Sequence, residues 1–300
     1  MPVSANVRSS FLHPRLPGFV CAFLVVCSYL IRLNHLNMSA WLAASRSPSC
    51  GEGLQLQSSI VTRACGRLFS PEAHDPDRFD SASIGGPWIQ PSTSEGESWK
   101  MWYHGRACTS DPQILSLSMG AIGLATSVDG YTWKRSLGEC ADGSVFAPDD
   151  DPTAFDAALV GMGCVIDDRL YYFGGSREPF TMGSREILGV RQSIGIAFWN
   201  GSAWTDRQIA LEHGPPGSWD EVFVASPQVV KHSPTDWRMY YHGVGREDRR
   251  FRIGLATSAD GIQWMRQGVI LGPNDASDAW DAGGCSRRHV FRAGPNNDYV

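Results

Sequence analysis

One motif returns four times along this chain, and it limits the possible folds more than any other feature of the sequence. Each unit opens with an aromatic residue followed by an aspartate, at Phe79-Asp80, Phe155-Asp156, Trp219-Asp220 and Trp280-Asp281. The aspartates at positions 80, 156, 220 and 281 are 76, 64 and 61 residues apart. Self-similarity at a nearly fixed period is typical of proteins built from copies of one structural module. We therefore expect a repeat architecture.

Within each complete unit, short runs rich in aromatic and β-branched residues alternate with Gly, Asp, Asn and Pro, and helical periodicity is nowhere sustained. The recurring runs are W-K-M-W-Y-H-G and A-I-G-L-A-T-S-V-D-G, R-L-Y-Y-F-G-G and S-I-G-I-A-F-W-N-G, and W-R-M-Y-Y-H-G and R-I-G-L-A-T-S-A-D-G. This pattern predicts four antiparallel strands per unit. The D-G and N-G pairs predict tight turns between the third and fourth strands, with type I′ geometry at Asn200-Gly201.

Four-stranded sheets of this kind cannot bury both faces alone, so the sequence predicts an all-β fold in which the sheets stack radially as the blades of a β-propeller. We expect blades near residues 75–140, 145–211 and 213–272, with the next one starting at 275–300. A propeller needs at least four blades to close. We therefore expect a five-bladed full-length protein that is truncated here after about three and a half blades.

Residues 1–70 differ in composition from the repeats, with six Arg, no Lys and the single acid Glu52. Their apolar run at 18–31 is shorter than the roughly 20 residues that a membrane-spanning helix needs. We interpret this segment as a largely disordered leader, either a chloroplast transit peptide ending near residues 60–65 or a secretory signal or membrane anchor. The mature domain, residues 71–300, is not expected to be embedded in a membrane.

Charge and cysteine spacing exclude several classes of ligand. The 26 basic and 31 acidic residues give a net charge of −5, and no basic block indicates binding to nucleic acid. Four of the eight cysteines lie in the leader, and Cys108, Cys140, Cys164 and Cys285 show no metal-binding spacing. We expect these four to be buried free thiols, and we expect no metal and no organic cofactor.

Alternating strand directions place the leading aspartates, the ends of the second strands and the long second-to-third connections at one end of the blades, here called the top. Those connections are residues 106–119, 176–192 and 244–252. Carboxylates ringed by Arg and aromatic residues suit a sugar, because glycoside cleavage needs one carboxylic acid and a second carboxylate as base or nucleophile. The candidate carboxylates at the top are Asp80, Asp156, Asp220, Glu221 and Asp281. The candidate substrate-binding residues are Asp220 and Asp281 together with His104, Arg106, Arg177, His242, Arg246 and Trp280.

The openings F-D and W-D, the run M-[WY]-Y-H-G and the run I-G-L-A-T-S-x-D-G resemble the five-bladed propeller glycosidases of the arabinanase, xylosidase, invertase and levansucrase superfamily. The resemblance covers about residues 75–300. It implies hydrolysis or transfer of a glycosidic bond in an oligosaccharide, a polysaccharide or a small glycoside. It also implies an Asp base or nucleophile in the first blade, an Asp that modulates pKa values in the second and a Glu acid in the third, which fall on Asp80, Asp156 and Glu221.

A second interpretation stays open. An aspartate repeated in every unit is also expected of a structural residue whose carboxylate accepts hydrogen bonds from the backbone of a neighbouring turn. Glu221 breaks the repeat, since Ser81, Ala157 and Ala282 occupy the matching positions. Adjacent strand residues point in opposite directions, so Asp220 and Glu221 should not share one site. His104 and His242 also recur, which is compatible with structural hydrogen bonding. The alternative function is a noncatalytic propeller that binds a glycan or a protein.

Overall fold

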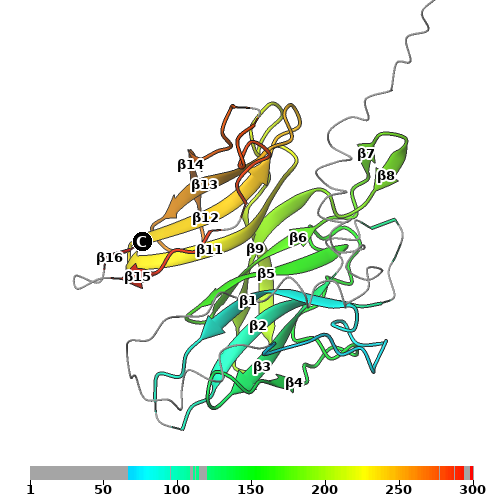
Figure 1. Cartoon of the computed structure of the whole chain (residues 1–300), viewed down its shortest axis with the longest axis vertical. Helices are drawn as coiled ribbons and strands as arrows, with labels where there is room; N and C mark the ends of the chain where they lie inside the picture. Colours follow the sequence, from blue (N-terminus) through cyan, green and yellow to red (C-terminus); the bar gives the residue numbers. More distant parts are fainter. Residues whose placement is uncertain are drawn as a thin grey trace, which may run out of the picture. The chain divides into compact units, whose positions relative to one another are not determined.

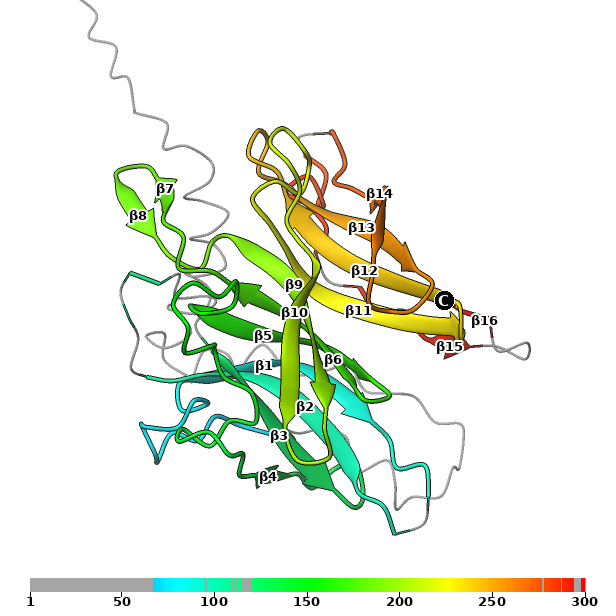
Figure 2. The same cartoon turned by 180° about the vertical axis from the view of Figure 1, so that it is seen from behind.

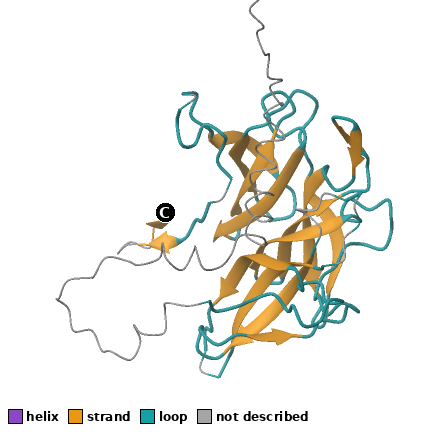
Figure 3. Ribbon diagram, turned by 45° about the vertical axis from the view of Figure 1, so that its right-hand side comes forward, coloured by secondary structure: helices purple, strands orange, loops and turns teal. Residues whose placement is uncertain are grey.

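The computed structural model describes residues 67–300 except for 95, 109–110, 112, 115–119, 277, 287, 294–297 and 300. The expected transit peptide and the apolar run at 18–31 therefore lie outside the described residues. In the part that is described, every regular element is a strand, and no helix could cross a membrane (Figure 3). The predicted all-β class is confirmed.

The first repeat forms a four-stranded antiparallel sheet whose strands are paired in chain order (Figure 1). Its strands are β1 (Ser83–Gln90), β2 (Trp99–Arg106), β3 (Ala121–Ser127) and β4 (Lys134–Ser136). Seven consecutive pairs join β2 to β3, and this regular register follows the aromatic and β-branched runs of the sequence. The sheet begins directly after Phe79-Asp80, so the motif stands at the entrance of the first strand.

The second repeat has the same strand order with one insertion. Its strands are β5 (Leu159–Ile166), β6 (Arg169–Gly175), β9 (Gln192–Trp199) and β10 (Trp204–Leu211). Figure 2 shows β10 alongside β9. The connection between β6 and β9 contains a separate hairpin made of β7 (Phe180–Met182) and β8 (Arg185–Ile187). The long second-to-third connection of this blade is therefore structured.

The third repeat forms another antiparallel sheet, and a two-stranded ladder follows it. The strands are β11 (Phe223–Ser233), β12 (Asp236–Val244), β13 (Phe251–Ser258) and β14 (Met265–Leu271), followed by β15 (Arg292–Ala293) and β16 (Asp298–Tyr299). One parallel pair, Phe223 with Gln192, links the second and third sheets. The first strands β1, β5 and β11 contact one another in series, as the inner strands of propeller blades do.

Apolar clusters between successive sheets form the core. Trp102 and Ile122 of the first blade pack with Val160, Met162 and Tyr172 of the second. A second cluster joins the next two blades, with members that include Cys164, Tyr171, Ile194, Val224 and Met239. Fully burying one large apolar side chain stabilises a fold by about 1.5–3 kcal/mol. Each blade therefore depends on its neighbour for the burial of its faces.

The tight turns predicted between third and fourth strands are present, and side-chain oxygens hold them. Oδ1 of Asp129 accepts hydrogen bonds from the N–H groups of Tyr131 and Thr132 at 2.8 and 2.6 Å. Asn200 does the same for Ser202 and Ala203 in the second blade. Gly201 has a φ of 106°, but Asn200 is not in the left-handed region. The type I′ geometry expected at Asn200-Gly201 is therefore wrong, because it requires a positive φ at both residues.

The repeated aspartate is the centre of a buried three-residue arrangement that we call the aspartate clasp. In the first blade, the Tyr103 hydroxyl of β2 donates to Asp80 Oδ2 at 2.8 Å. Nε of Arg135, on β4, donates to the same oxygen at 2.6 Å, and Arg78 pairs with Oδ1 at 3.1 Å. The clasp thus ties the entrance of the first strand to the second and fourth strands.

The other two complete blades contain the same clasp. Asp156 accepts from Tyr172 at 2.8 Å and from Arg207 at 2.9 Å. Asp220 accepts from Tyr241 at 3.4 Å and from Arg266 at 3.0 Å, completing the set. In each blade the aromatic residue before the aspartate lies against the clasp tyrosine, with ring centroids 5.6–6.0 Å apart. The F-D and W-D motif is therefore explained by packing and by hydrogen bonding together.

A bulge keeps the clasp intact where the sequence spacing changes. Arg135 and Arg266 stand two residues after a Trp, whereas Arg207 stands three residues after Trp204. Asp206 has a φ of 53°, and the pairing register of β10 with β9 shifts between Thr205 and Gln208. A bulge absorbs one extra residue and redirects the next side chain. The arginine consequently reaches its aspartate in all three blades.

Close packing around the clasp explains the glycines of the repeat. A Cβ atom added to Gly105, Gly174 or Gly243 would lie only 2.7, 2.3 or 2.7 Å from the Cβ atom of the clasp aspartate in its blade. Real carbon atoms do not approach so closely, so any larger residue forces neighbouring atoms to move. The glycine two residues after each clasp tyrosine is therefore required, because no larger side chain fits there.

Substitution of a clasp aspartate should destabilise the whole chain. We expect Asp156→Ala to lower the free energy of unfolding by about 3 kcal/mol, because Arg207 and Tyr172 lose their buried partner. Asp150→Ala, an exposed aspartate in the same segment, should change it by less than about 0.5 kcal/mol. Urea unfolding of the full chain measures both, and equal midpoints for the two variants would contradict the clasp.

The first-blade clasp also predicts a dependence on pH. Burial raises the pKa of Asp80, but hydrogen bonds from Arg135 and Tyr103 and the charges of Arg135 and Arg78 outweigh it, so the pKa lies below its ordinary value. Because the pKa of Asp80 is lower in the folded state than the unfolded-state value of about 3.9, its charged form stabilises the fold at pH values above about 3.9. This stabilisation is lost as the pH falls through the folded-state pKa.

The difference in unfolding free energy between the wild type and Asp80→Asn should therefore be largest near neutral pH and should narrow below about pH 4. Asp77→Asn changes an exposed aspartate three residues away and serves as the control, with no such trend expected. Chemical unfolding at a series of pH values gives both curves. A constant difference for Asp80→Asn across that series would disprove the predicted linkage.

Candidate functional site

The structure places the three clasp aspartates inside their own blades. Asp80 and Asp156 are 0% exposed and Asp220 is 1% exposed, and the partners of each are a Tyr and an Arg of the same repeat. A carboxylate with no solvent access and two or more donors already bound is poorly placed to attack a substrate. This placement favours the structural interpretation of the repeated aspartates over direct contact with a sugar.

Glu221 lies next to Asp220, and its side chain takes a different direction. Its Oε1 accepts from Nε of Arg246 at 2.9 Å, and its Oε2 accepts from the N–H of Gly217 at 2.9 Å. Asp220 instead contacts Ser218, Tyr241 and Arg266. Glu221, the residue that breaks the repeat, thus has a carboxylate that does not take part in the clasp.

The surroundings of Glu221 hold it in the charged form. The backbone N–H of Gly217 and then the hydrogen bond from Arg246 lower the pKa of Glu221 below its ordinary value. A general acid at neutral pH needs the opposite shift, because it must keep its proton until the reaction. The geometry therefore favours Glu221 as a base, a nucleophile or a stabiliser of positive charge, rather than as the acid.

The insertion of the second blade reaches the surroundings of Glu221. Nη1 of Arg191 donates to the Glu221 carbonyl oxygen at 2.9 Å. The ring of Phe180, on β7, lies 5.0 Å from the Arg246 guanidinium and 5.8 Å from that of Arg191. Such cation–π contacts hold arginine side chains in one orientation. The β7–β8 connection therefore helps to build the site, and Glu221 receives contacts from two blades.

A pocket of 430 Å³ opens beside Glu221, and we call it the blade-3 pocket. Its lining consists of Gly217, Ser218, Trp219, Glu221, Gly245, Arg246, Glu247, Asp248 and Arg252. The volume is within the range of small-molecule sites. Asp248 is engaged by Arg250 and Arg252, whereas Glu247 is exposed and belongs to no ion pair within the described residues. Glu221 and Glu247 therefore bring two carboxyl groups to one pocket.

Sequence reasoning missed Glu247, Arg191 and Phe180. Glu247 and Arg191 lie in the predicted loop ranges 244–252 and 176–192, but their types do not recur in the other units. Phe180 belongs to a hairpin that the repeat does not contain. A search of these variable loops for acidic residues would have found Glu247. Nothing in the sequence indicates that Phe180 packs against two arginines of different blades.

The remaining candidate residues have separate surroundings. Arg177 donates to the carbonyl of Ala157 at 3.3 Å and lines another pocket, of 520 Å³. Arg106 donates to Nε2 of His104 at 3.1 Å, and Nδ1 of His242 lies 3.1 Å from the carbonyl oxygen of Ser286. These contacts, like the recurrence of the histidines, are compatible with structural hydrogen bonding.

The fourth unit is arranged differently from the three complete ones. Trp280 is 96% exposed, whereas Phe79 is 3% exposed in the same place of the first unit. Oδ1 of Asp281 is buried and has no hydrogen-bond partner. Trp280 and Asp281 are therefore not joined to Glu221 or to a clasp in the described residues, and of the eleven candidates the structure directly joins Glu221 to Arg246 and His104 to Arg106.

The cysteines of the described region are free thiols, but they are not uniformly buried. Cys164 is buried, its sulfur accepts from the N–H of Val229, and burial raises the pKa of its thiol to about 12. Cys108 is exposed, so the expectation of a buried thiol is wrong there. Its place in the loop that follows β2 explains this exposure. The described residues contain no group of three or more His, Cys, Asp or Glu side chains placed to hold a metal ion.

Comparison with known proteins shows likeness in structure only. No family model and no curated protein sequence matches this chain. A solved glycoside hydrolase superimposes with a TM-score of 0.55 at 18% identity, over 75% of this chain and 66% of that one. A putative glycoside hydrolase from Parabacteroides distasonis gives 0.47 at 16% identity, over 75% and 64%. A β-1,2-mannobiose phosphorylase from Listeria innocua gives 0.42 at 19% identity, over 67% and 49%.

The chain thus spans about half to two thirds of the length of these three structures. The first superposition agrees with the three successive four-stranded sheets and their adjoining first strands. The number of blades in the full-length protein and the expected truncation stay predictions. This chain has a β-propeller fold, and its structure is similar to that of a solved glycoside hydrolase.

Proposed function

We propose that this protein is a carbohydrate-active enzyme that hydrolyses or transfers a glycosidic bond in the blade-3 pocket. The observation that carries the proposal is the presence of two carboxyl groups, on Glu221 and Glu247, in one open pocket with Trp219 and Arg246. An indole can stack on a sugar ring, and a guanidinium can bind hydroxyl groups. The substrate would be an oligosaccharide, a polysaccharide or a small glycoside. The likeness to a solved glycoside hydrolase supports this class of reaction.

The two carboxyl groups have different surroundings. Glu221 is kept charged by Gly217 and Arg246, which suits a base on water or a nucleophile at the anomeric carbon. Glu247 is the second carboxyl group of the pocket and belongs to no ion pair within the described residues, so it is the remaining candidate for the acid in a two-carboxylate mechanism. We therefore propose Glu221 as the charged group and Glu247 as the acid, in place of the roles expected for Glu221 and Asp80 from the resemblance.

A noncatalytic propeller that binds a glycan is the second candidate function. The observation that favours it is that Asp80, Asp156 and Asp220 are all engaged in clasps. Among the described residues, the entrance aspartates of the three complete blades are thus bound within their own blades. Under this alternative, the blade-3 pocket would bind a sugar through Trp219 and Arg246 without cleaving it.

We also propose import into the plastid, on the Arg-rich and acid-poor composition of residues 1–70. Fusion of these residues to a fluorescent protein should direct it to plastids when expressed in plant cells. A fusion in which residues 1–70 are reversed in order keeps the composition and is the control. Secretion of the native fusion, or its retention in a membrane, would favour the alternative based on residues 18–31.

The enzymatic proposal predicts that both glutamates are needed for turnover. Glu221→Gln and Glu247→Gln should each lower kcat on a cleaved substrate by about a hundredfold or more, since each removes one acid–base or nucleophilic group. Glu186→Gln, on the exposed β8 strand, is the matched control and should leave kcat unchanged.

The assay begins with the full chain on aryl glycosides, sucrose and arabinan. Wild-type activity that survives in both pocket variants would refute the proposed pair. Binding of these sugars without any cleavage by the wild type would overturn the enzymatic proposal in favour of the binding function. Circular dichroism of each variant separates loss of chemistry from loss of fold.

A further inference from the structure

A second pocket, of 340 Å³, lies between the first and second blades, and we call it the tryptophan pocket. Its lining includes Gln90, Lys100, Trp102, Glu139, Trp199 and Trp204. Apart from Glu139, which follows β4, these residues come from the end of β1, the first half of β2, the end of β9 and the start of β10. Glu221 instead precedes the first strand of the third blade. The tryptophan pocket is therefore at the opposite end of the strands from the site proposed above.

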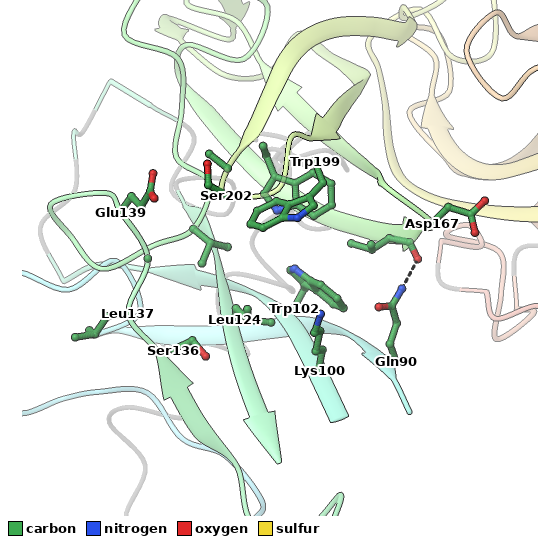
Figure 4. A pocket seen from close by; sticks show the side chains of 15 residues that line it. Gln90, Lys100, Trp102, Leu124, Ser136, Leu137, Glu139, Asp167, Trp199 and Ser202 are labelled. Atoms are coloured by element: carbon green, nitrogen blue, oxygen red, sulfur yellow. Dashed lines mark hydrogen bonds between the residues drawn. The ribbon is translucent and has the colours of Figure 1, made fainter. Parts of the chain in front are cut away.

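Three indoles surround this pocket from two blades. Trp199 and Trp204 contact each other edge to face, with centroids 5.3 Å apart and planes inclined by 60°. Figure 4 shows Trp199 across the pocket from Trp102 and Lys100. Trp199 is 43% exposed, so the pocket is open to solvent. Core packing explains the buried ring of Trp102, but it gives no reason for an exposed Trp199 beside an open space.

Polar groups border the indoles without filling the space between them. Nε2 of Gln90 donates to the carbonyl oxygen of Val165 at 3.0 Å, which fixes the amide. A dashed line at Gln90 marks this bond in Figure 4. Lys100 is exposed and forms no ion pair within the described residues, and Glu139 is also exposed. Asp167 is neutralised by Lys231 at 2.6 Å. Within the part of the chain that the structure describes, Lys100 and Glu139 are the charged lining residues that belong to no ion pair, and their opposite charges leave the lining close to neutral.

The chemistry of this lining selects its ligand. Flat indole faces favour a ring with apolar C–H surfaces, and the surrounding amide, ammonium and carboxylate groups favour an edge that carries hydroxyl groups. A charged ligand would find no excess of opposite charge. We propose that the tryptophan pocket binds a neutral sugar unit of a larger saccharide, as a carbohydrate site separate from the blade-3 pocket. This inference shares with the proposed function only the class of ligand.

The test is saturation-transfer NMR on the full chain with neutral disaccharides, namely cellobiose, xylobiose, arabinobiose and mannobiose. We expect ring protons of at least one of them to receive saturation from the wild type. Trp199→Ala should weaken that binding about tenfold, because it removes the exposed indole. Tyr131→Ala removes an exposed aromatic residue outside the pocket and should leave the affinity unchanged.

Two results would overturn the inference. One is an absence of binding by all four disaccharides to the wild type. The other is equal affinity of the wild type and Trp199→Ala, confirmed by unmoved indole N–H resonances of Trp199 and Trp204 during titration. In that second case the sugar occupies another site.

Glu221→Gln distinguishes this failure from failure of the proposed function. It should lower kcat by about a hundredfold or more, while the indole resonances of Trp199 and Trp204 still respond to the disaccharide. Retained cleavage in Glu221→Gln would contradict the proposed enzymatic role of Glu221 and would leave the inference about the tryptophan pocket unchanged. Loss of the indole response in Glu221→Gln would contradict a separate tryptophan pocket.

Discussion

The buried contact of one aspartate with a tyrosine and an arginine is the interaction on which this fold depends. Removing a carboxylate from water costs several kcal/mol, and that cost is offset only where donors surround it. Asp80 receives donors from β2 and β4, so an ordered clasp requires the first strand entrance, the second strand and the fourth strand to be in register. The same requirement recurs with Asp156 and Asp220. Each complete unit therefore keeps the same arrangement of first-strand entrance, second strand and fourth strand. The glycines and aromatic residues of the motif are the ones that fit around this arrangement.

The clasps also decide where chemistry can occur. A carboxylate that fixes the geometry of its own blade is not available to a substrate. The residues that recur in every unit therefore stabilise the fold, and the residues that do not recur are the candidates for function. Glu221 and Glu247 are such exceptions, and both line the blade-3 pocket. The β7–β8 insertion departs from the repeat as well, and its Phe180 orders the arginines near Glu221. Function in this molecule is thus proposed at the places where the units differ.

Sequence reasoning predicted the fold well because the signals were local. Four-stranded units, their order and the turns at Asp129 and Asn200 follow from runs of a few residues. Asp220 and Glu221 bind different partners, as expected, although both precede β11 and strand alternation is therefore not the reason. The clasp partners were harder to foresee, since Arg135 is 55 positions from Asp80 and the bulge at Asp206 shifts Arg207 by one residue. The direction of the Glu221 pKa depends on contacts with Gly217 and Arg246, which spacing alone does not show.

The central claim is that the repeated aspartates act through their arginines to hold the blades together. A double-mutant cycle on Asp220 and Arg266 measures this directly, with unfolding free energies for the wild type, Asp220→Ala, Arg266→Ala and the double variant. The account predicts a coupling energy of about 2 kcal/mol, because either single change leaves a partner uncompensated. Additive effects, within about 0.5 kcal/mol, would contradict it and would return the aspartates to the list of residues available for catalysis.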